Sequence, residues 1–187
     1  YLIKQKRSIG ISEEEIIKIA INTLGLNELS DFNPKERIIE YMLEDLSKEK
    51  LINLTLVDFA NETSSESPAP GGGSISAYCG SLGAALGTMV ANLSSHKRGW
   101  DDRWEEFSEW AEKGLTYQNK LLDLVDEDTN AFNKIMEAYR LPKSTDIEKE
   151  KRNKSIQDAT KNAIMVPFSI MEISAASLEV IKMMQTI

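Results

Sequence analysis

No Asp, Glu, Lys or Arg occurs between Ser67 and Ser95, although these four residue types make up 28% of the chain. A segment of this length can be buried along its whole extent, inside a protein or inside a bilayer. Its many Gly, Ser, Ala and Asn residues dilute the Leu, Ile, Phe and Val that dominate membrane-spanning helices. We therefore expect a helix packed inside a soluble protein, and no membrane partner.

The uncharged segment opens with a stiffened glycine loop, Pro68-Ala69-Pro70-Gly71-Gly72-Gly73-Ser74. Three glycines allow a ligand to approach bare backbone, and the prolines restrict the chain before them. Ser74 is a favourable N-cap for a helix reaching about Leu93, so free amides and the positive helix end would face the loop. The predicted substrate-binding residues here are Pro70, Gly71, Gly72, Gly73 and Ser74. The alternative is a simple turn. A nucleotide phosphate loop is not indicated, because its Gly-Lys-Ser or Gly-Lys-Thr ending is missing.

Small residues recur at helical spacing after the loop. Five of them lie three or four positions apart, namely Gly80, Gly83, Ala84, Gly87 and Ala91. This spacing leaves a shallow groove in which a second helix can approach closely. We interpret these residues as packing positions.

Capping and turn signals divide the rest of the chain into helices. Ser12 and Glu15 predict a helix that ends near Leu24, and Thr55 predicts a short helix after it. Long helices are expected at 104–139 and from Thr145 onward, with a kink or restart at Pro167. Residues 26–36 read as a loop and 37–43 as a strand. The predicted organisation is a remnant of an α/β domain at 1–43, a linker at 44–53 and an all-α antiparallel helical bundle at 54–187.

One acidic residue interrupts an apolar helix face. Projection of 104–139 at about 100° per residue aligns one stripe, which consists of Tyr117, Leu121, Leu124, Val125, Phe132, Ile135, Met136 and Tyr139. Asp128 lies in the middle of the stripe, whereas Asp126 and Glu127 fall on the solvated side. Acids buried among apolar groups titrate abnormally and concentrate in functional sites. Asp128 is therefore the predicted catalytic residue. The alternative is a structural aspartate bonded to backbone or a neighbouring helix.

Bulk composition excludes several classes of function. The formal net charge of -8 argues against nucleic-acid binding. His96 is the single histidine and Cys79 the single cysteine, so no Cys/His metal cluster can form, and we expect no metal and no tightly bound cofactor. One cysteine cannot form an intrachain disulfide, and no basic-then-apolar leader opens the chain, so we expect a cytoplasmic protein.

The loop, Gly83 to Gly87 and Met89 to Leu93 resemble the start of the cyclodeaminase domain of formiminotransferase-cyclodeaminases. Leu124 to Asp128, Arg140 to Lys143 and Ala163 to Pro167 look like later blocks of the same family. At the front, Arg7 to Ile11 and Arg37 to Tyr41 are similar to the end of its formiminotransferase domain.

The resemblance implies an all-helical homo-oligomer, a homodimer or larger. It implies conversion of 5-formimidoyltetrahydrofolate to 5,10-methenyltetrahydrofolate with release of ammonia, in histidine degradation and one-carbon folate metabolism. The second aspartate of the Asp-x-Asp block, Asp128 here, carries the family's catalytic role. Lys143 or Arg140 is a weaker candidate for holding the folate electrostatically. Most of the formiminotransferase domain is missing, which implies loss of the transfer activity. The final helices of the cyclodeaminase domain are also missing, so whether the truncated chain is active stays open.

Two alternative functions remain open from the sequence. A methenyltetrahydrofolate cyclohydrolase on the same domain would use the same loop and acid to hydrolyse the product. A non-catalytic dimerisation module would pair the small-residue helix with its copy.

Overall fold

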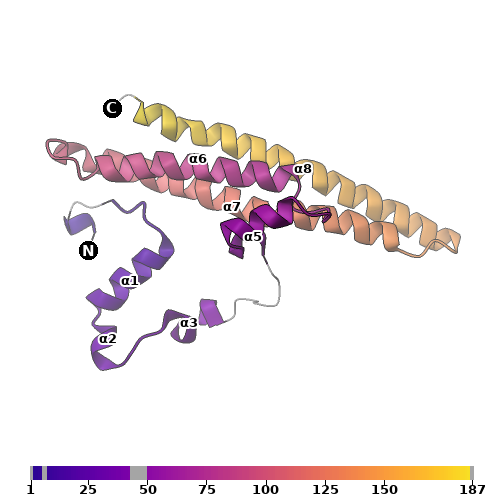
Figure 1. Cartoon of the computed structure of the whole chain (residues 1–187), viewed down its shortest axis with the longest axis horizontal. Helices are drawn as coiled ribbons and strands as arrows, with labels where there is room; N and C mark the ends of the chain where they lie inside the picture. The colour runs from indigo at the N-terminus through magenta and orange to yellow at the C-terminus, as the bar shows by residue number, and fades with distance from the viewer. Residues whose placement is uncertain (1, 6–7, 43–49, 186–187) are drawn as a thin grey trace.

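The computed structural model describes residues 2–5, 8–42 and 50–185, and every regular element in these ranges is helical. Three long helices form the body: α6 (Gly72–Ser94), α7 (Trp104–Arg140) and α8 (Asp146–Met184). They lie side by side as an elongated rod (Figure 1). The shorter elements are η1 (Ile3–Gln5), α1 (Glu13–Thr23), α2 (Leu26–Leu29), α3 (Pro34–Arg37), α4 (Ile39–Met42), η2 (Leu51–Asn53), α5 (Leu56–Thr63) and η3 (Asp101–Arg103). The predicted all-α bundle is confirmed.

The core of the rod lies where α6, α7 and α8 meet. Its buried cluster consists of Ala77, Leu121, Val125, Ala131, Val166 and Ile170. Small residues bring the helices close together: a Cβ on Gly87 would lie 3.1 Å from a methyl group of Val180, and a Cβ on Gly114 would overlap the hydroxyl of Thr88. The packing role predicted for the glycines of α6 therefore holds at Gly80 and Gly87, and Gly114 adds a matching position on α7. It is wrong for Gly83, where a Cβ would meet nothing within 4 Å.

Local capping signals are mostly confirmed. The hydroxyl of Thr55 accepts the amide of Asp58 at 3.1 Å and begins α5. At α8 the capping box is complete: Thr145 accepts the Glu148 amide at 3.2 Å, and the Glu148 carboxylate accepts the amides of Thr145 and Ser144 at 2.9 and 2.8 Å. These two amides hold the pKa of Glu148 below its usual range. Pro167 lies inside α8, which continues through it without a restart.

The N-terminal part differs from prediction in its secondary structure. The segment predicted as a strand at 37–43 ends α3 and forms α4, with residue 43 outside the described ranges. The segment predicted as a loop contains α2 and most of α3. The side chain of Asn33 accepts the amide of Lys35, and Pro34 fits the first turn of a helix. These capping residues start a helix here, although the apolar residues after them had suggested a strand. Most of the predicted linker lies outside the described residues, and its end forms η2.

A short piece of this N-terminal part packs on the bundle. The amide of Ile9 donates to the hydroxyl of Ser108 at 2.9 Å, and the side-chain amide of Asn92 donates to the carbonyl of Gly10 at 2.8 Å. A Cβ on Gly10 would overlap the backbone of Ala111. Residues 8–10 are therefore fastened to both α6 and α7.

Two helices of the described chain, α6 and α8, are long and apolar enough to cross a membrane by length and composition alone. The core helix of a soluble protein passes the same test. Ala77, Ala84 and Ala91 of α6 are completely buried against its neighbours, so packing inside the bundle accounts for the small uncharged residues on one face of this helix.

Candidate functional site

Asp128 of α7 meets the first turn of α6. The amide of Ser74 donates to Oδ2 of Asp128 at 3.0 Å, and the Ser74 hydroxyl lies 3.2 Å from the same oxygen and 2.8 Å from the carbonyl of Val125. Gly71 is the N-cap of α6 and offers no side chain for capping. The carboxylate of Asp128 therefore supplies the cap from another helix, where the helix dipole favours negative charge.

The glycine loop leaves room for this carboxylate. A Cβ on Gly73 would overlap the carboxyl group of Asp128, and a Cβ on Gly71 would lie 3.8 Å from Oδ2. A Cβ on Gly72 would meet nothing within 4 Å. The position of Asp128 thus requires a glycine only at Gly73. Gly72 is exposed and has room for a side chain.

Ser74 does not occupy its predicted position. It is the third residue of α6, not the N-cap, and it is completely buried. The N-cap of α6 lies three residues earlier than predicted, at Gly71, because Asp128 satisfies the amide that a local cap would otherwise need. Ser74 therefore holds Asp128 in place, and its side chain does not face a ligand. Pro70 is also buried and follows a cis peptide bond from Ala69.

Asp128 lines a small pocket of about 170 Å³ together with Pro68, Ala69, Gly71, Thr129, Phe132, Ile135 and Ala163. Asp128 is half-buried, so it is not completely shielded from solvent as its place in the apolar stripe had led us to expect. The reason is that Phe132 and Met136 on the same stripe are themselves 37% and 40% exposed. Within the described residues, Oδ1 of Asp128 accepts no hydrogen bond, so one oxygen is anchored and the other is free.

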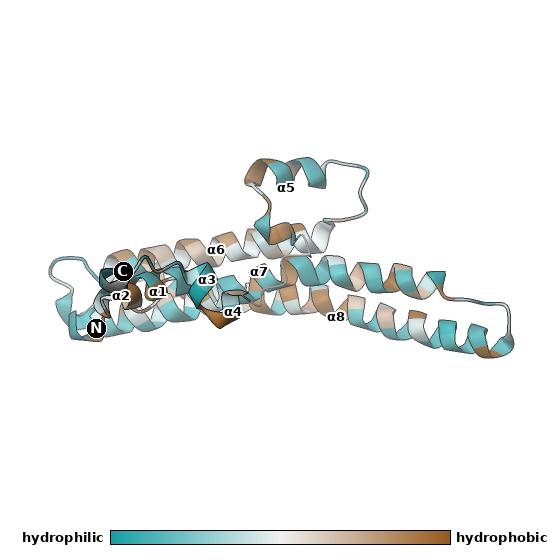
Figure 2. Cartoon of the chain, turned by 90° about the horizontal axis from the view of Figure 1, so that it is seen from below, coloured by the Kyte–Doolittle hydropathy of each residue, from teal (hydrophilic) through white to brown (hydrophobic). Residues whose placement is uncertain are grey.

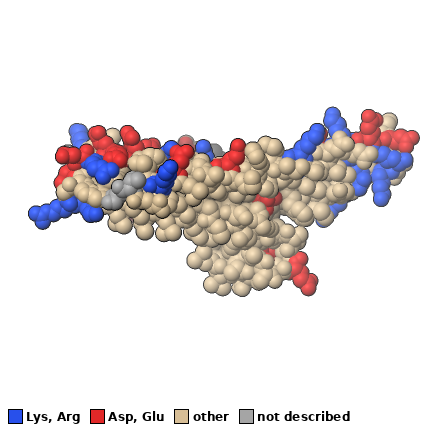
Figure 3. All heavy atoms as spheres, turned by 90° about the horizontal axis from the view of Figure 1, so that it is seen from above, with Lys and Arg blue, Asp and Glu red and all other residues tan. Residues whose placement is uncertain are grey.

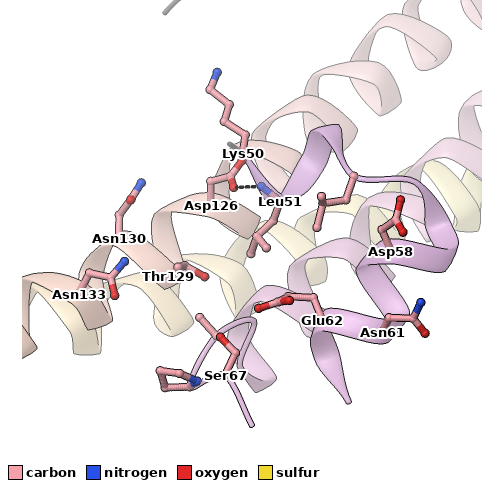
Figure 4. Close-up of a pocket in the computed structure, with 13 residues that line it drawn as sticks. Lys50, Leu51, Asp58, Asn61, Glu62, Ser67, Asp126, Thr129, Asn130 and Asn133 are labelled. Carbon is pink, nitrogen blue, oxygen red and sulfur yellow. Dashed lines mark hydrogen bonds between the residues drawn. The ribbon is translucent and has the colours of Figure 1, made fainter. Parts of the chain in front are cut away.

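A larger pocket of about 810 Å³ adjoins the small one (Figure 4). The two share Pro68, Ala69 and Thr129. The larger pocket lies between α5, η2 and α7 and is lined by Lys50, Leu51, Leu54, Asp58, Asn61, Glu62, Ser67, Asp126, Asn130 and Asn133 as well. Most of these side chains are polar, in contrast to the apolar wall beside Asp128.

Asp126 was expected on the solvated side of α7, and that expectation is wrong. Its Oδ1 accepts the amide of Leu51 at 2.7 Å, and its buried Oδ2 has no hydrogen-bond partner in the described part of the chain. The segment around η2 covers this side of the helix, which the periodicity of α7 alone does not reveal. The pocket residues of α5, above all Glu62, gave no sequence signal, since a short helix after a linker does not indicate where it packs.

The basic candidates lie farther along α7. Arg140 lines a third pocket of about 250 Å³ with Pro68, Phe132, Asn133, Met136 and Glu137. Twelve helical residues separate it from Asp128, a rise of roughly 18 Å. Lys143 is exposed in the loop that follows α7 and lines none of these pockets, so the structure does not bring it to Asp128.

Comparison with known proteins identifies the relationship behind this geometry. The family model described as formiminotransferase-cyclodeaminase matches residues 55–187, and the model of the formiminotransferase domain matches residues 1–44. The chain belongs to the formiminotransferase-cyclodeaminase family. Its Asp128 pocket lies within the first match, and its residues 8–10 lie within the second.

Relatives of known name include members of this family. The chain is 39% identical over 171 residues to a formimidoyltransferase-cyclodeaminase of Gallus gallus and 36% identical over 173 residues to that of Mus musculus. These alignments cover 91% and 92% of the chain, and the chain spans about a third of either relative, 32% in both cases.

Two further matches complete the comparison. A methenyltetrahydrofolate cyclohydrolase of Methylorubrum extorquens is 38% identical over 117 residues, which is 63% of this chain and 56% of that protein. Among solved structures, a formiminotetrahydrofolate cyclodeaminase of Thermotoga maritima matches with 25% identity and a TM-score of 0.48, over 72% of this chain and 78% of that one.

Proposed function

We propose that the chain is the cyclodeaminase part of a bifunctional enzyme and converts 5-formimidoyltetrahydrofolate to 5,10-methenyltetrahydrofolate and ammonia. Membership of the family supports this activity. The observation that carries it is the Asp128 carboxylate, which is held at one oxygen by Ser74 at the glycine end of α6 while Asp128 itself lines a pocket. No tightly bound cofactor is required.

The chemistry needs one proton carrier. N10 of the folate attacks the formimidoyl carbon and a bond forms between them, while N10 loses its proton. The formimidoyl group enters as its protonated amidinium, so one further proton on the exocyclic nitrogen makes it a leaving ammonia. The bond from that nitrogen to the carbon then breaks, and the positive charge remains on the methenyl product. A carboxylate within reach of both nitrogens can take the first proton and deliver the second. The free Oδ1 of Asp128 serves this role, while the anchored Oδ2 fixes its direction.

The glycine loop orients the substrate beside this acid. The amides of Gly72 and Gly73 donate to no acceptor among the described residues, and the first amides of a helix attract oxygen atoms and negative charge. Gly71 and Gly72 are the reachable part of the predicted binding loop. Arg140 suits a carboxylate at the far end of the folate better than Lys143, because it lines a pocket next to Phe132.

Replacing Asp128 with Asn tests the proposal. The amide oxygen can still accept the Ser74 amide, so the fold should persist, but the proton carrier is lost. We expect ammonia release and methenyl absorbance to fall by about a hundredfold or more. Asp123→Asn, on an exposed position of α7, serves as the matched control and should retain full turnover. Unchanged turnover in the correctly folded Asp128→Asn variant would make Asp128 structural.

A second candidate function is methenyltetrahydrofolate cyclohydrolase, favoured by the named relative in Methylorubrum extorquens. We prefer the cyclodeaminase because residues 1–44 match the formiminotransferase domain, whose fusion to a cyclodeaminase appears in the names of the vertebrate relatives. Incubation with 5,10-methenyltetrahydrofolate distinguishes the two, since a cyclohydrolase hydrolyses this compound, whereas for the cyclodeaminase it is the product and is not hydrolysed.

Three wider proposals follow from the same relationship. The activity belongs to histidine degradation and one-carbon folate metabolism. The protein acts in the cytoplasm, in keeping with its single free cysteine. It works as a homo-oligomer, because apolar side chains of α6 and α8 remain uncovered: Leu82, Leu86, Met89, Leu93, Ile164, Met165, Phe168, Met171 and Leu178 are all 46% exposed or more. Figure 2 shows hydrophobic residues along both helices.

A further inference from the structure

The larger pocket beside Asp128 contains carboxylate groups that the proposed reaction does not use. Asp58 and Glu62 come from α5, and Asp126 comes from the facing side of α7. Asp58 is occupied, since it accepts the hydroxyl of Thr55 at 2.5 Å within the helix cap. The carboxylate of Glu62 makes no hydrogen bond or ion pair with any described residue, and this side chain points into the cavity (Figure 4).

Asp126 adds a second incompletely hydrogen-bonded carboxylate on the opposite wall of the pocket. Its Oδ1 accepts the amide of Leu51, and its buried Oδ2 receives no hydrogen bond from any described residue. A buried acceptor without a partner is unfavourable, so such a group calls for a specific explanation. Among the described residues that line the pocket, Lys50 is the one basic side chain against three carboxylates, those of Asp58, Glu62 and Asp126. The described lining therefore carries a net negative charge, which suits a ligand that presents hydrogen-bond donors to a carboxylate.

The position of the cavity limits what that ligand can be. Pro68, Ala69 and Thr129 line both this pocket and the Asp128 pocket, so the two are neighbours across a narrow divide. Its volume of about 810 Å³ falls in the range of sites for small organic molecules. A group bound here would belong to the same molecule that reacts at Asp128.

We propose that this pocket binds the pterin ring of the substrate through its 2-amino-4-oxo edge, with the Glu62 carboxylate as the acceptor. That edge presents two adjacent donors, the ring N3–H and the 2-amino group, which match the two oxygens of a carboxylate in a charge-assisted pair. Because N5 belongs to the pterin ring, anchoring the ring here places the formimidoyl group toward Asp128. The identification of the ligand as a folate rests on the proposed function.

Equilibrium binding tests the assignment with the full chain. The probes are 5-formyltetrahydrofolate, which is chemically stable, and its 2-deamino analogue, in which hydrogen replaces the amino group. In the wild-type protein the analogue should bind about tenfold to a hundredfold more weakly, the range for loss of a hydrogen bond to a charged group. Glu62→Gln should weaken binding of the parent compound by a similar factor and bind both compounds equally.

Glu66→Gln is the matched control, because this glutamate is exposed four residues farther along and lines none of the pockets described. It should retain wild-type affinity and discrimination. Wild-type affinity in Glu62→Gln, continued discrimination in that variant, or failure of the wild-type chain to bind either compound would overturn the inference. The proposed function fails separately: a chain that releases no ammonia but shows the expected discrimination keeps the pterin pocket and loses the cyclodeaminase assignment.

Discussion

At the scale of single residues, the site depends on one contact between a backbone and a carboxylate. Gly73 has no Cβ, so the Asp128 carboxyl group can lie directly against α6 and receive the Ser74 amide. Capping of this kind contributes about 1 kcal/mol to helix stability. The acid proposed for catalysis is therefore also a part of the fold.

Gly73→Ala should disrupt both roles. The new methyl group overlaps the carboxyl group of Asp128 and forces it away from Ser74. We expect a loss of about 1–3 kcal/mol in the free energy of unfolding, as for other overpacked sites, and a fall in ammonia release. Urea unfolding measures the first effect and the turnover assay the second.

Gly72→Ala provides the control for stability, since its methyl group would enter open space. It should unfold at the wild-type urea concentration or slightly above, because alanine is the better helix former. Equal stability of the two variants would contradict the steric role of Gly73.

The residues of the site were predictable to different degrees. Asp128 was identified because its conflict with an apolar stripe is visible in one helix. The position of Ser74 inside α6 could not be predicted, because this helix is capped by a residue of another helix, Asp128 of α7. The environment of Asp126 depends on Leu51, a distant partner, and nothing in a local pattern indicates such a pairing.

At the scale of elements, caps written in the sequence were the most reliable signals. Thr55 and Thr145 begin their helices as predicted, because the side chain and the amide it binds are only three residues apart. The strand predicted before the linker was wrong, since a short run of apolar residues does not distinguish a strand from a helical turn.

Thr145→Ala should therefore weaken the start of α8. The hydroxyl that accepts the Glu148 amide is lost, and we expect about 0.5–2 kcal/mol less stability toward urea. Thr160→Ala is the matched control. The Thr160 hydroxyl donates only to the Ile156 carbonyl within the helix, so its loss should leave the free energy of unfolding unchanged. Equal effects of the two changes would show that the cap is not stabilising.

At the scale of the whole molecule, charge and apolar surface are separated. Charged side chains gather toward the two ends of the rod on the face in Figure 3, and the middle of that face carries few. The uncovered side chains of α6 and α8 lie on the helices that a homo-oligomer would use. Exposed apolar patches of this extent on soluble proteins mark sites of association.

Leu86→Glu should shift the assembly toward monomers. Leu86 is 61% exposed on α6, and a charge there would have to be buried when two copies meet. Sedimentation velocity at several concentrations should show an oligomer for the wild-type chain and a lighter species for the variant. Ile147→Glu is the control, because Ile147 is 81% exposed in the first turn of α8, seventeen residues before Ile164, the first of the named apolar residues on that helix. A wild-type chain that sediments as a monomer would contradict the proposal.

The attachment of residues 8–10 has a mechanical consequence for α7. The N-terminal segment contacts α7 first where Ile9 meets Ser108 and again where Leu51 meets Asp126. The two contacts are eighteen residues apart, roughly 27 Å along the axis. The segment between Ile9 and Leu51 is thus attached to α7 at both of its ends. A force that pulls on this segment would act on α7 at two points, and one of them, Asp126, is two residues from Asp128.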